Sequence, residues 1–255
     1  MQILYLIILF VLGTLFGSFF TVVGMRLPKN EGVIKSRSHC DECMHSLSFL
    51  DMVPIFSFLF LKGKCRYCGK KVNNLSTWME LFTGILFALS YFTFGFSYGL
   101  FFALGIVSLL IIISVSDMSY YIIPDEILVF FSGYFVILTA LNSGVKVALL
   151  SMVSGVILFS FMYLVMLCGN FLFKKESLGG GDIKLMFVIG IVLHPFLGLF
   201  VIFLASVIAL PISLIMLWKR NKNLVPFGPF LLIAFMLIYF TRIDMETIIN
   251  FIRSF

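Results

Sequence analysis

The stretch LLIIISVSDMSYYIIPD, residues 109–125, shows the pattern that decides the class of the fold: a long apolar run with very few charged residues, which stops at Asp117. Hydrophobic residues make up 61% of the 255-residue chain and charged residues only 12%, with a mean hydropathy of +1.13. A water-soluble domain carries about twice that charged fraction. The sequence therefore predicts an all-α polytopic membrane protein whose apolar residues face lipid.

Apolar segments that could cross a bilayer follow one another along most of the chain. A crossing helix needs about 20 residues, and fewer where it packs inside a bundle. The division between the sixth and seventh segments rests on His194-Pro195, since proline interrupts a helix. About eight transmembrane helices are expected, over residues 3–24, 78–97, 99–116, 126–141, 146–171, 183–194, 196–218 and 227–243.

Positive charges divide unevenly between the two sides of such a bundle. With the N-terminus outside, 15 of the 18 Lys and Arg residues fall inside, as is typical of cytoplasmic loops. This explains the net charge of +6 without a nucleic-acid partner, and no such partner is expected. The first segment has no basic residue before its apolar run, which indicates a retained helix and not a cleaved signal peptide. We expect a multi-pass protein of a bacterial cytoplasmic membrane. The inside residues are Arg26, Lys29, Lys35, Arg37, Lys62, Lys64, Arg66, Lys70, Lys71, Lys174, Lys175, Lys184, Lys219, Arg220 and Lys222, and the outside ones are Lys146, Arg242 and Arg253.

Two Cys-x-x-Cys pairs, separated by 21 residues, lie in the polar segment 28–77. Such pairs let four thiolates converge on a tetrahedral zinc ion, which stabilises a loop too small to build a core. Gly69 suits the tight turn of a zinc knuckle. We expect residues 1–27 to form the first transmembrane helix, residues 28–77 a cytoplasmic zinc-knuckle domain, and residues 78–255 the membrane core. The expected ligands are Cys40, Cys43, Cys65 and Cys68.

Other interpretations of the cysteines are weaker. Disulfides are disfavoured on the reducing side of the membrane, and no βαβ pattern supports a thioredoxin-like pair. His39 and His45 flank the first pair and could replace a ligand, although loop histidines are more often solvated. Cys168 stands alone in an apolar segment and is expected to be a packing residue.

Acidic residues near the predicted helices are few. An ionisable group at membrane depth is energetically costly, so each one calls for a structural or functional explanation. Asp125 and Glu126 follow Pro124, which is ordinary chemistry for the start of a helix. Glu80, near the start of the second span, is interpreted as an interfacial anchor. Asp117 is different, because the helix dipole opposes a negative charge at a helix C-terminus.

A second unusual aspartate lies in SLGGGDIKL, residues 177–185. Asp182 could cap the helix that follows, but a cap does not require three preceding glycines. Consecutive glycines can adopt positive φ and let another backbone approach closely, which would suit an extended substrate strand.

The predicted topology places Asp117 and Asp182 at the same inner face of the membrane. Two neighbouring carboxyl groups cannot both ionise easily, so one keeps a proton. One group can then take a proton from water while the other donates to a carbonyl oxygen, which is aspartic proteolysis. The residues alone leave structural caps and the proton relay of a transporter open as alternatives.

The ordered set of motifs resembles the type IV prepilin peptidases, the bacterial branch of the GxGD membrane aspartyl proteases. The resemblance extends over most of the chain. It is carried by GSFFTVVGMRLP (residues 17–28), the cysteine segment 36–72, WMELFTG (78–84), DMSYYIIPDEI (117–127), GGGDIKL (179–185) and VPFGPFL (225–231).

The resemblance implies an aspartic endopeptidase with Asp117 and Asp182 as its catalytic pair and zinc on the four cysteines. Gly179, Gly180 and Gly181 would support the substrate. The family cleaves the leader of prepilins or pseudopilins at the cytoplasmic face, after a glycine and before an apolar helix. Many members then N-methylate the new terminus with S-adenosylmethionine. The expected partners are such substrates and the lipid bilayer. The alternative is a membrane scaffold with a zinc-bound loop, or a proton-coupled transporter.

Overall fold

The structure is a computed structural model that describes residues 1–33, 39–40, 42–72, 74–174, 178–218 and 225–242. Parts of the predicted cysteine loop (34–38, 41 and 73) and the end of the last predicted span, at residue 243, lie outside the described residues. Several charges of the topology prediction lie outside them too: Lys35, Arg37, Lys175, Lys219, Arg220, Lys222 and Arg253. The chain divides into two compact units, Met1–Leu100 and Phe101–Phe255.

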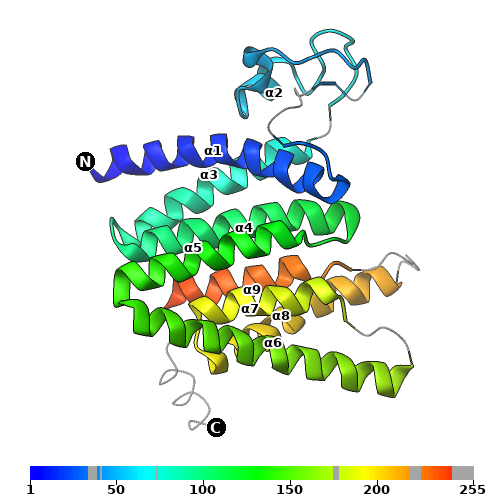
Figure 1. The fold of residues 1–255 in the computed structure, drawn as a ribbon. Coiled ribbons are helices and arrows are strands. Elements are labelled where there is room, and N and C mark those ends of the chain that lie inside the picture. Colours follow the sequence, from blue (N-terminus) through cyan, green and yellow to red (C-terminus); the bar gives the residue numbers. More distant parts are fainter. Residues whose placement is uncertain (34–38, 41, 73, 175–177, 219–224, 243–255) are drawn as a thin grey trace. The chain divides into compact units, whose positions relative to one another are not determined.

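The described chain is built from α-helices, with short 3-10 turns and no named strand, so the all-α membrane fold is confirmed. The eight predicted spans correspond in order to eight of these helices, and the short α2 lies in the polar segment (Figure 1). The break at His194-Pro195 is confirmed as the junction of two helices. The helices are α1 (Gln2–Arg26), α2 (Phe56–Phe60), α3 (Leu75–Phe94), α4 (Tyr98–Tyr120), α5 (Asp125–Ser143), α6 (Val145–Phe173), α7 (Gly180–Val192), α8 (Pro195–Trp218) and α9 (Gly228–Thr241).

Helix length separates the spans into two groups. Within the described residues, six helices are long and apolar enough to cross a membrane: α1, α3, α4, α5, α6 and α8. The other two, α7 and α9, have 13 and 14 residues. At 1.5 Å per residue they rise only about 20 Å. Most of their residues are buried, as expected for helices enclosed by others.

In the first unit, α1 and α3 lie side by side (Figure 1). Small residues allow this close approach. A Cβ atom on Gly13 would lie 2.8 Å from the Cα of Gly84, and one on Gly17 would lie 2.8 Å from the Cα of Glu80. In a membrane the hydrophobic effect does not drive two apolar helices together, so backbone contact through small residues is the main source of their association.

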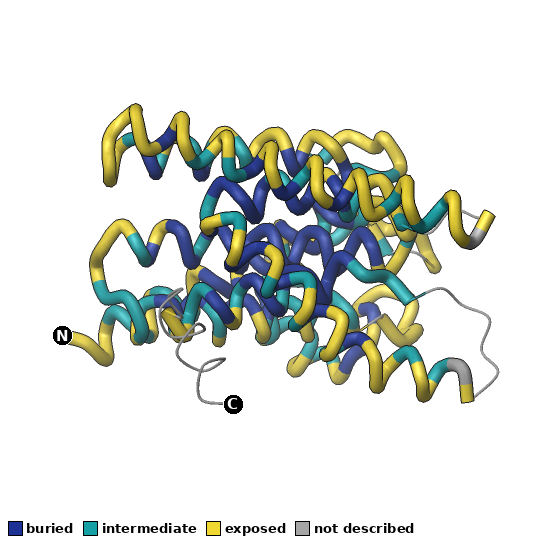
Figure 2. Tube along the Cα trace, turned by 90° about the horizontal axis from the view of Figure 1, so that it is seen from below, coloured by how far each residue is buried: buried dark blue, intermediate teal, exposed yellow. Residues whose placement is uncertain are grey.

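Most of α4 belongs to the second unit, and α4 is the most buried of the six long helices. In its most apolar 18-residue stretch, 83% is buried inside the protein. Phe102 of α4 stacks on Phe135 of α5, at a centroid distance of 5.9 Å, and also meets Tyr239 of α9. Helix α7 packs against α5 and α6. Figure 2 shows buried residues on the inward faces of the helices and exposed ones on their outward faces.

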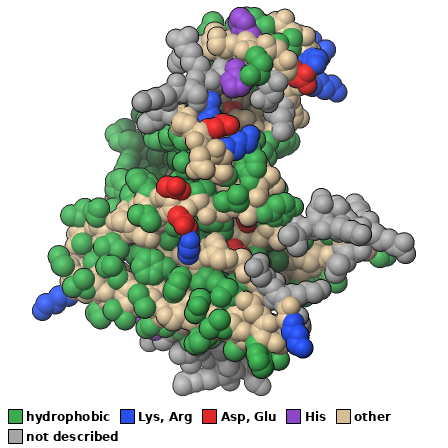
Figure 3. Space-filling view, turned by 45° about the vertical axis from the view of Figure 1, so that its right-hand side comes forward, with side chains coloured by type: hydrophobic (Ala, Val, Ile, Leu, Met, Phe, Trp, Pro, Cys, Tyr) green, Lys and Arg blue, Asp and Glu red, His purple; other side chains and the backbone are tan. Residues whose placement is uncertain are grey.

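The outward faces are apolar, as a lipid-facing surface requires. Along α6, large residues such as Leu150, Leu164 and Phe171 are exposed. The face drawn in Figure 3 carries many hydrophobic side chains and few charged ones over its helices. The protein is therefore an integral membrane protein.

The Gly13–Gly84 contact gives a testable prediction for the first unit. Gly13→Ala should lower its free energy of unfolding by about 1–3 kcal/mol, because the added methyl group meets backbone atoms that cannot move aside. Thermal unfolding in detergent measures the change. Gly133→Ala is the matched control, because a Cβ on Gly133, in the middle of α5, meets no atom within 4 Å. Equal midpoints for both variants would contradict close packing at Gly13.

Candidate active site and candidate metal centre

Asp117 lies near the C-terminal end of α4 and is buried, with only 6% of its surface exposed. Its Oδ2 atom accepts a hydrogen bond from the backbone N–H of Gly228, at 3.2 Å. Gly228 is the first residue of α9. The N-terminus of one helix therefore supports a carboxyl group at the end of another.

Asp182 lies in the first turn of α7. The helix begins at Gly180 and its N-cap is Gly179, so the alternative that Asp182 caps this helix is wrong. Its side chain is half-buried, and its carboxyl group is close enough to that of Asp117 for their charges to interact. The structure thus brings together two aspartates that are far apart in the sequence.

Ile123 connects the surroundings of the two aspartates. It lies in the short segment between α4 and α5. A Cβ on Gly181, next to Asp182, would lie 2.9 Å from the Cβ of Ile123. A Cβ on Gly228 would lie 3.1 Å from its Cδ1. One apolar side chain therefore packs on both glycines that adjoin the carboxyl groups.

The three glycines before Asp182 differ in their surroundings. Gly181 makes the close approach to Ile123, whereas a Cβ on Gly180 would meet nothing within 4 Å. The expectation of positive φ is wrong here. The described glycines with positive φ are Gly63, Gly69, Gly95 and Gly144. Close approach, and not a left-handed backbone, is the property that the structure uses at Gly181.

Asp125 and Glu126 occupy the first turn of α5 after Pro124, which confirms that they belong to a helix start. Asp125 accepts two hydrogen bonds from the Nζ of Lys184, at 2.8 and 2.7 Å. Both side chains are at least half exposed. The pair links α5 to α7 at the surface, and an exposed ion pair contributes little to stability.

The four cysteines form two knuckles with the same backbone pattern. In each knuckle the first cysteine carbonyl accepts from the N–H four residues later: Met44 to Cys40 at 2.8 Å and Gly69 to Cys65 at 2.9 Å. Met44 and Gly69 both have positive φ, at 57° and 72°. The predicted tight turn at Gly69 is confirmed.

The knuckles point their sulfur atoms at one another, and the four Sγ atoms of Cys40, Cys43, Cys65 and Cys68 all lie within 4.8 Å of each other. A tetrahedral ion with metal–sulfur bonds of about 2.3 Å requires sulfur–sulfur distances of about 3.8 Å. The four cysteines could therefore hold one metal ion. Neither His39 nor His45 belongs to this group. Backbone N–H groups of Cys68 and Tyr67 lower the pKa of the Cys65 thiol to about 7, whereas burial and the neighbouring cysteines raise the pKa of Cys68 to about 11.

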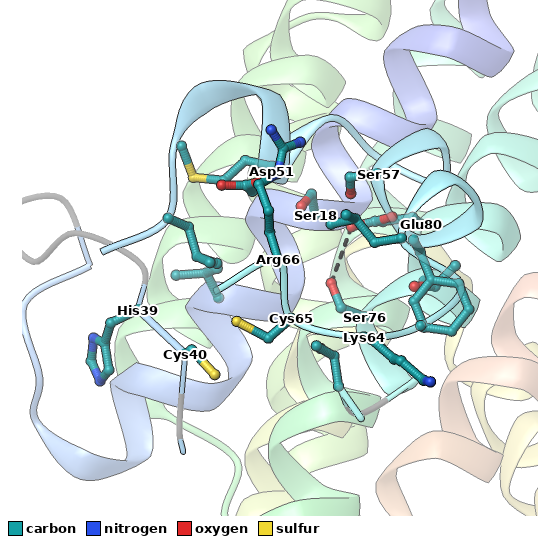
Figure 4. Close-up of a pocket in the computed structure, with 18 of the residues that line it drawn as sticks. Ser18, His39, Cys40, Asp51, Ser57, Lys64, Cys65, Arg66, Ser76 and Glu80 are labelled. Atoms are coloured by element: carbon teal, nitrogen blue, oxygen red, sulfur yellow. Dashed lines mark hydrogen bonds and ion pairs between the residues drawn. The ribbon is translucent and has the colours of Figure 1, made fainter. Parts of the chain in front are cut away.

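A cavity of about 550 Å³ lies beside the cysteine cluster, within the first unit (Figure 4). Cys40 and Cys65 line one part of it, and Arg26 and Glu80 line others. Glu80 is buried, with 6% of its surface exposed. Its Oε2 atom accepts the N–H of Ile55 at 2.9 Å, and Oε1 accepts the hydroxyl of Ser76 at 3.1 Å. The interpretation of Glu80 as an interfacial anchor is therefore wrong, because its carboxylate is buried and fixes the loop to α3.

Asp51, a second carboxylate of the cavity wall, joins the loop to the second knuckle. Its Oδ2 accepts hydrogen bonds from the hydroxyls of Ser48, at 2.6 Å, and Tyr67, at 3.2 Å. Its Oδ1 lies 2.8 Å from Nε of Arg66. Chiefly the Ser48 hydroxyl holds the pKa of Asp51 below its usual value. The sequence analysis missed Asp51, although Ser48-x-x-Asp51 has the spacing of a capping box.

Comparison with known proteins covers both units. Residues 11–94 match the family described as "Bacterial Peptidase A24 N-terminal domain", and residues 104–214 match the "Type IV leader peptidase family". A "Prepilin leader peptidase/N-methyltransferase" of Bacillus subtilis is 38% identical over 73% of this chain and 73% of its own length. Those of Myxococcus xanthus and Vibrio cholerae are 32% and 28% identical, over 86% and 94% of this chain and 65% and 98% of their own lengths. No solved structure matches.

The chain belongs to the type IV leader peptidase family. Membership makes it a peptidase and decides against the scaffold and transporter alternatives. Asp117 and Asp182 both lie inside the matched segment 104–214, and the cysteine cluster lies inside the matched segment 11–94. Gly228 lies beyond both matches, in the motif VPFGPFL (225–231) on which the resemblance partly rests. The sequence analysis gave it no role, because its partner Asp117 is 111 residues away.

The cysteine geometry predicts one bound metal ion per chain of this leader peptidase. Cys65→Ser should lose the metal and make the loop sensitive to protease, because a loop of this size depends on its metal to stay folded. Elemental analysis of purified protein measures the ratio. Cys168→Ser is the matched control, because Cys168 lies on α6, outside the cluster. Full metal content in Cys65→Ser would contradict the four-cysteine site.

Proposed function

We propose that this leader peptidase cleaves prepilins or pseudopilins with Asp117 and Asp182 as its catalytic aspartates. The observation that carries the proposal is that the two carboxyl groups lie close enough for their charges to interact, beside two glycines, Gly181 and Gly228, that pack on the same Ile123 side chain. Two interacting carboxyl groups share a proton between them, and such a pair can activate water and protonate a peptide carbonyl. The segment formed by Gly179, Gly180 and Gly181 would support the substrate backbone beside Asp182. A Cβ on Gly180 would meet no atom within 4 Å, so this residue leaves room for it, whereas Gly181 packs on Ile123.

The proposed orientation follows the positive charges. Fifteen of the 18 Lys and Arg residues would lie on the cytoplasmic side of a bacterial cytoplasmic membrane, with the N-terminus outside. The cysteine domain and both aspartates then face the cytoplasm. An apolar segment of the prepilin could lie in lipid against the helices, with its leader reaching the carboxyl groups.

The peptidase is tested by co-expression with a prepilin from the same genome and a gel assay for leader removal. Asp117→Asn and Asp182→Asn should each reduce the cleavage rate at least about a hundredfold, because each removes one partner of acid–base catalysis. Glu126→Gln is the control, since Glu126 is an exposed residue in the first turn of α5. Cleavage by folded Asp182→Asn at the wild-type rate would remove that residue from the chemistry.

We infer that the metal on Cys40, Cys43, Cys65 and Cys68 is zinc with a structural role. Four thiolates and a tetrahedral arrangement suit zinc, and they leave no open position for a substrate or a water molecule. The ion would hold the two knuckles together and thereby shape the neighbouring cavity, whose wall includes Cys40 and Cys65.

A second activity, N-methylation of the new terminus, is supported by the cavity of the first unit. The names of the relatives include "N-methyltransferase", and S-adenosylmethionine supplies a methyl group to an amine when bound. Its amino-acid part is zwitterionic and its adenine is flat and weakly polar. The cavity offers Glu80 and Asp51 to a cation, Arg26 to a carboxylate, and Phe58 and Leu61 to a ring. We propose that these residues hold the methyl donor.

Binding of labelled S-adenosylmethionine to the purified protein tests this site without any turnover. Glu80→Gln should weaken binding about tenfold, because it removes the negative charge while keeping a hydrogen-bond acceptor for Ile55. Leader cleavage should persist in this variant. Glu126→Gln, on α5 and outside the cavity, is the control and should bind like the wild type. Wild-type affinity in Glu80→Gln would place the donor elsewhere.

A further inference from the structure

The two aspartates of the pair have unequal surroundings. Asp117 is buried and accepts a backbone hydrogen bond from Gly228. Asp182 is half-buried, and no described residue donates a hydrogen bond to its side chain. A donor held at a carboxylate favours the charged form, and an undonated, partly desolvated carboxyl group favours the neutral one. Burial acts against the charged form of both residues, and only Asp117 has a donor that favours it. The hydrogen bond from Gly228 therefore divides the charge and the proton between the two residues.

In the first turn of α9, the N–H group of Gly228 donates to Asp117 and not to a backbone carbonyl. The N–H groups of Phe230 and Leu231 both donate to the carbonyl of Phe227, at 3.1 Å. Pro229 has no N–H group. Only Gly228 in this turn donates to the carboxylate, and the positive end of the helix dipole acts in the same direction.

We propose that Gly228 is a positioning residue that holds Asp117 as the ionised member of the pair, so that Asp117 is the general base and Asp182 carries the proton. This assignment rests on the proposed peptidase function and deepens it. It also explains why a glycine is needed at residue 228. A Cβ there would lie 2.8 Å from Oδ2 of Asp117, which would push the carboxylate away from the N–H group.

The assignment fixes the route of each proton during hydrolysis. Asp117 takes a proton from water as the water oxygen bonds to the peptide carbon, and Asp182 gives its proton to the carbonyl oxygen. The resulting diol carries two hydroxyl groups, Asp117 is now neutral, and Asp182 is charged. When the C–N bond breaks, Asp117 gives its proton to the leaving nitrogen and Asp182 takes one from a hydroxyl. Both residues return to their starting states.

The pH dependence of leader cleavage tests the proposal. In Gly228→Ala the acid limb of the profile should move to higher pH by about one unit, because a carboxylate without its donor is protonated more easily. Activity needs ionised Asp117, so it would be lost at a higher pH as the pH falls. Lys184, two residues after Asp182 on α7, is held by Asp125 of α5 in an exposed ion pair. Gly133→Ala is the control and should keep the wild-type profile.

A double variant separates the carboxylate contact from packing against Ile123. The added methyl group at residue 228 would also lie 3.1 Å from Cδ1 of Ile123. Ile123→Ala removes that atom and leaves the Asp117 contact in place. In Gly228→Ala combined with Ile123→Ala, the shifted acid limb should therefore remain. A return to the profile of Ile123→Ala alone would show that packing was the cause, and would overturn the proposal.

Exchange of the Gly228 amide for an ester, introduced by nonsense suppression with glycolic acid, removes the N–H group and adds no atom. It keeps the proposal testable if Gly228→Ala does not fold. The same acid-limb shift is expected. The matched control is an ester at Phe230, whose N–H donates to Phe227 and not to Asp117. That control should lower stability and leave the pH profile unchanged.

The outcomes distinguish failure of the proposed peptidase function from failure of the role proposed for Gly228. If the wild type does not cleave prepilin, or if folded Asp117→Asn does, the proposed function fails. If both aspartates are required but the residue 228 ester keeps the wild-type pH profile, only the positioning role of Gly228 and the assignment of the base are overturned.

Discussion

A carboxylate inside an apolar bundle persists only where a donor replaces the water it has lost. In the second unit that donor is the first N–H group of α9, and Asp117 receives it. The contact imposes conditions on the rest of the unit. Helix α9 must begin at the level where α4 ends, residue 228 must lack a side chain, and the segment between α4 and α5 must place Ile123 beside it.

The first unit also contains a buried carboxylate that needs hydrogen-bond donors, and there the donors are a loop N–H group and a hydroxyl group. Glu80 is buried on α3 where α1 approaches through Gly17, and the N–H of Ile55 and the hydroxyl of Ser76 satisfy its two oxygens. Ile55 has φ at 61°, which is unfavourable for a β-branched residue, so the loop is held by its contacts and not by its own preference. A short loop without a core thus depends on a carboxylate at one end and on four sulfur atoms at the other.

Local patterns in the sequence predicted what local physics determines. Apolar runs predicted the helices, and His194-Pro195 predicted the junction of α7 and α8. The cysteine spacing predicted the two knuckles. Glu80 was misjudged because its burial depends on Gly17 and on Ile55, which lie in other segments. The role of Gly228 was missed for the same reason, although its segment VPFGPFL was among the quoted motifs. Its role appears only when a partner 111 residues away is brought next to it, and helical periodicity carries no information about that distance.

The proposed hydrolysis needs water at Asp117 and Asp182, whereas the outward faces of the surrounding helices are apolar and suit lipid. The two helices whose N-termini meet at the pair, α7 and α9, have only 13 and 14 residues. Each rises about 20 Å, while the hydrocarbon core of a bilayer is about 30 Å thick. Neither helix can fill that depth, so the ends at Gly180 and Gly228 are completed by loops, glycines and backbone N–H groups. These are polar elements that a lipid-exposed surface would exclude. The shortness of α7 and α9 therefore suits the proposed active site, because it places polar helix ends beside Asp117 and Asp182 and encloses them with protein in place of lipid.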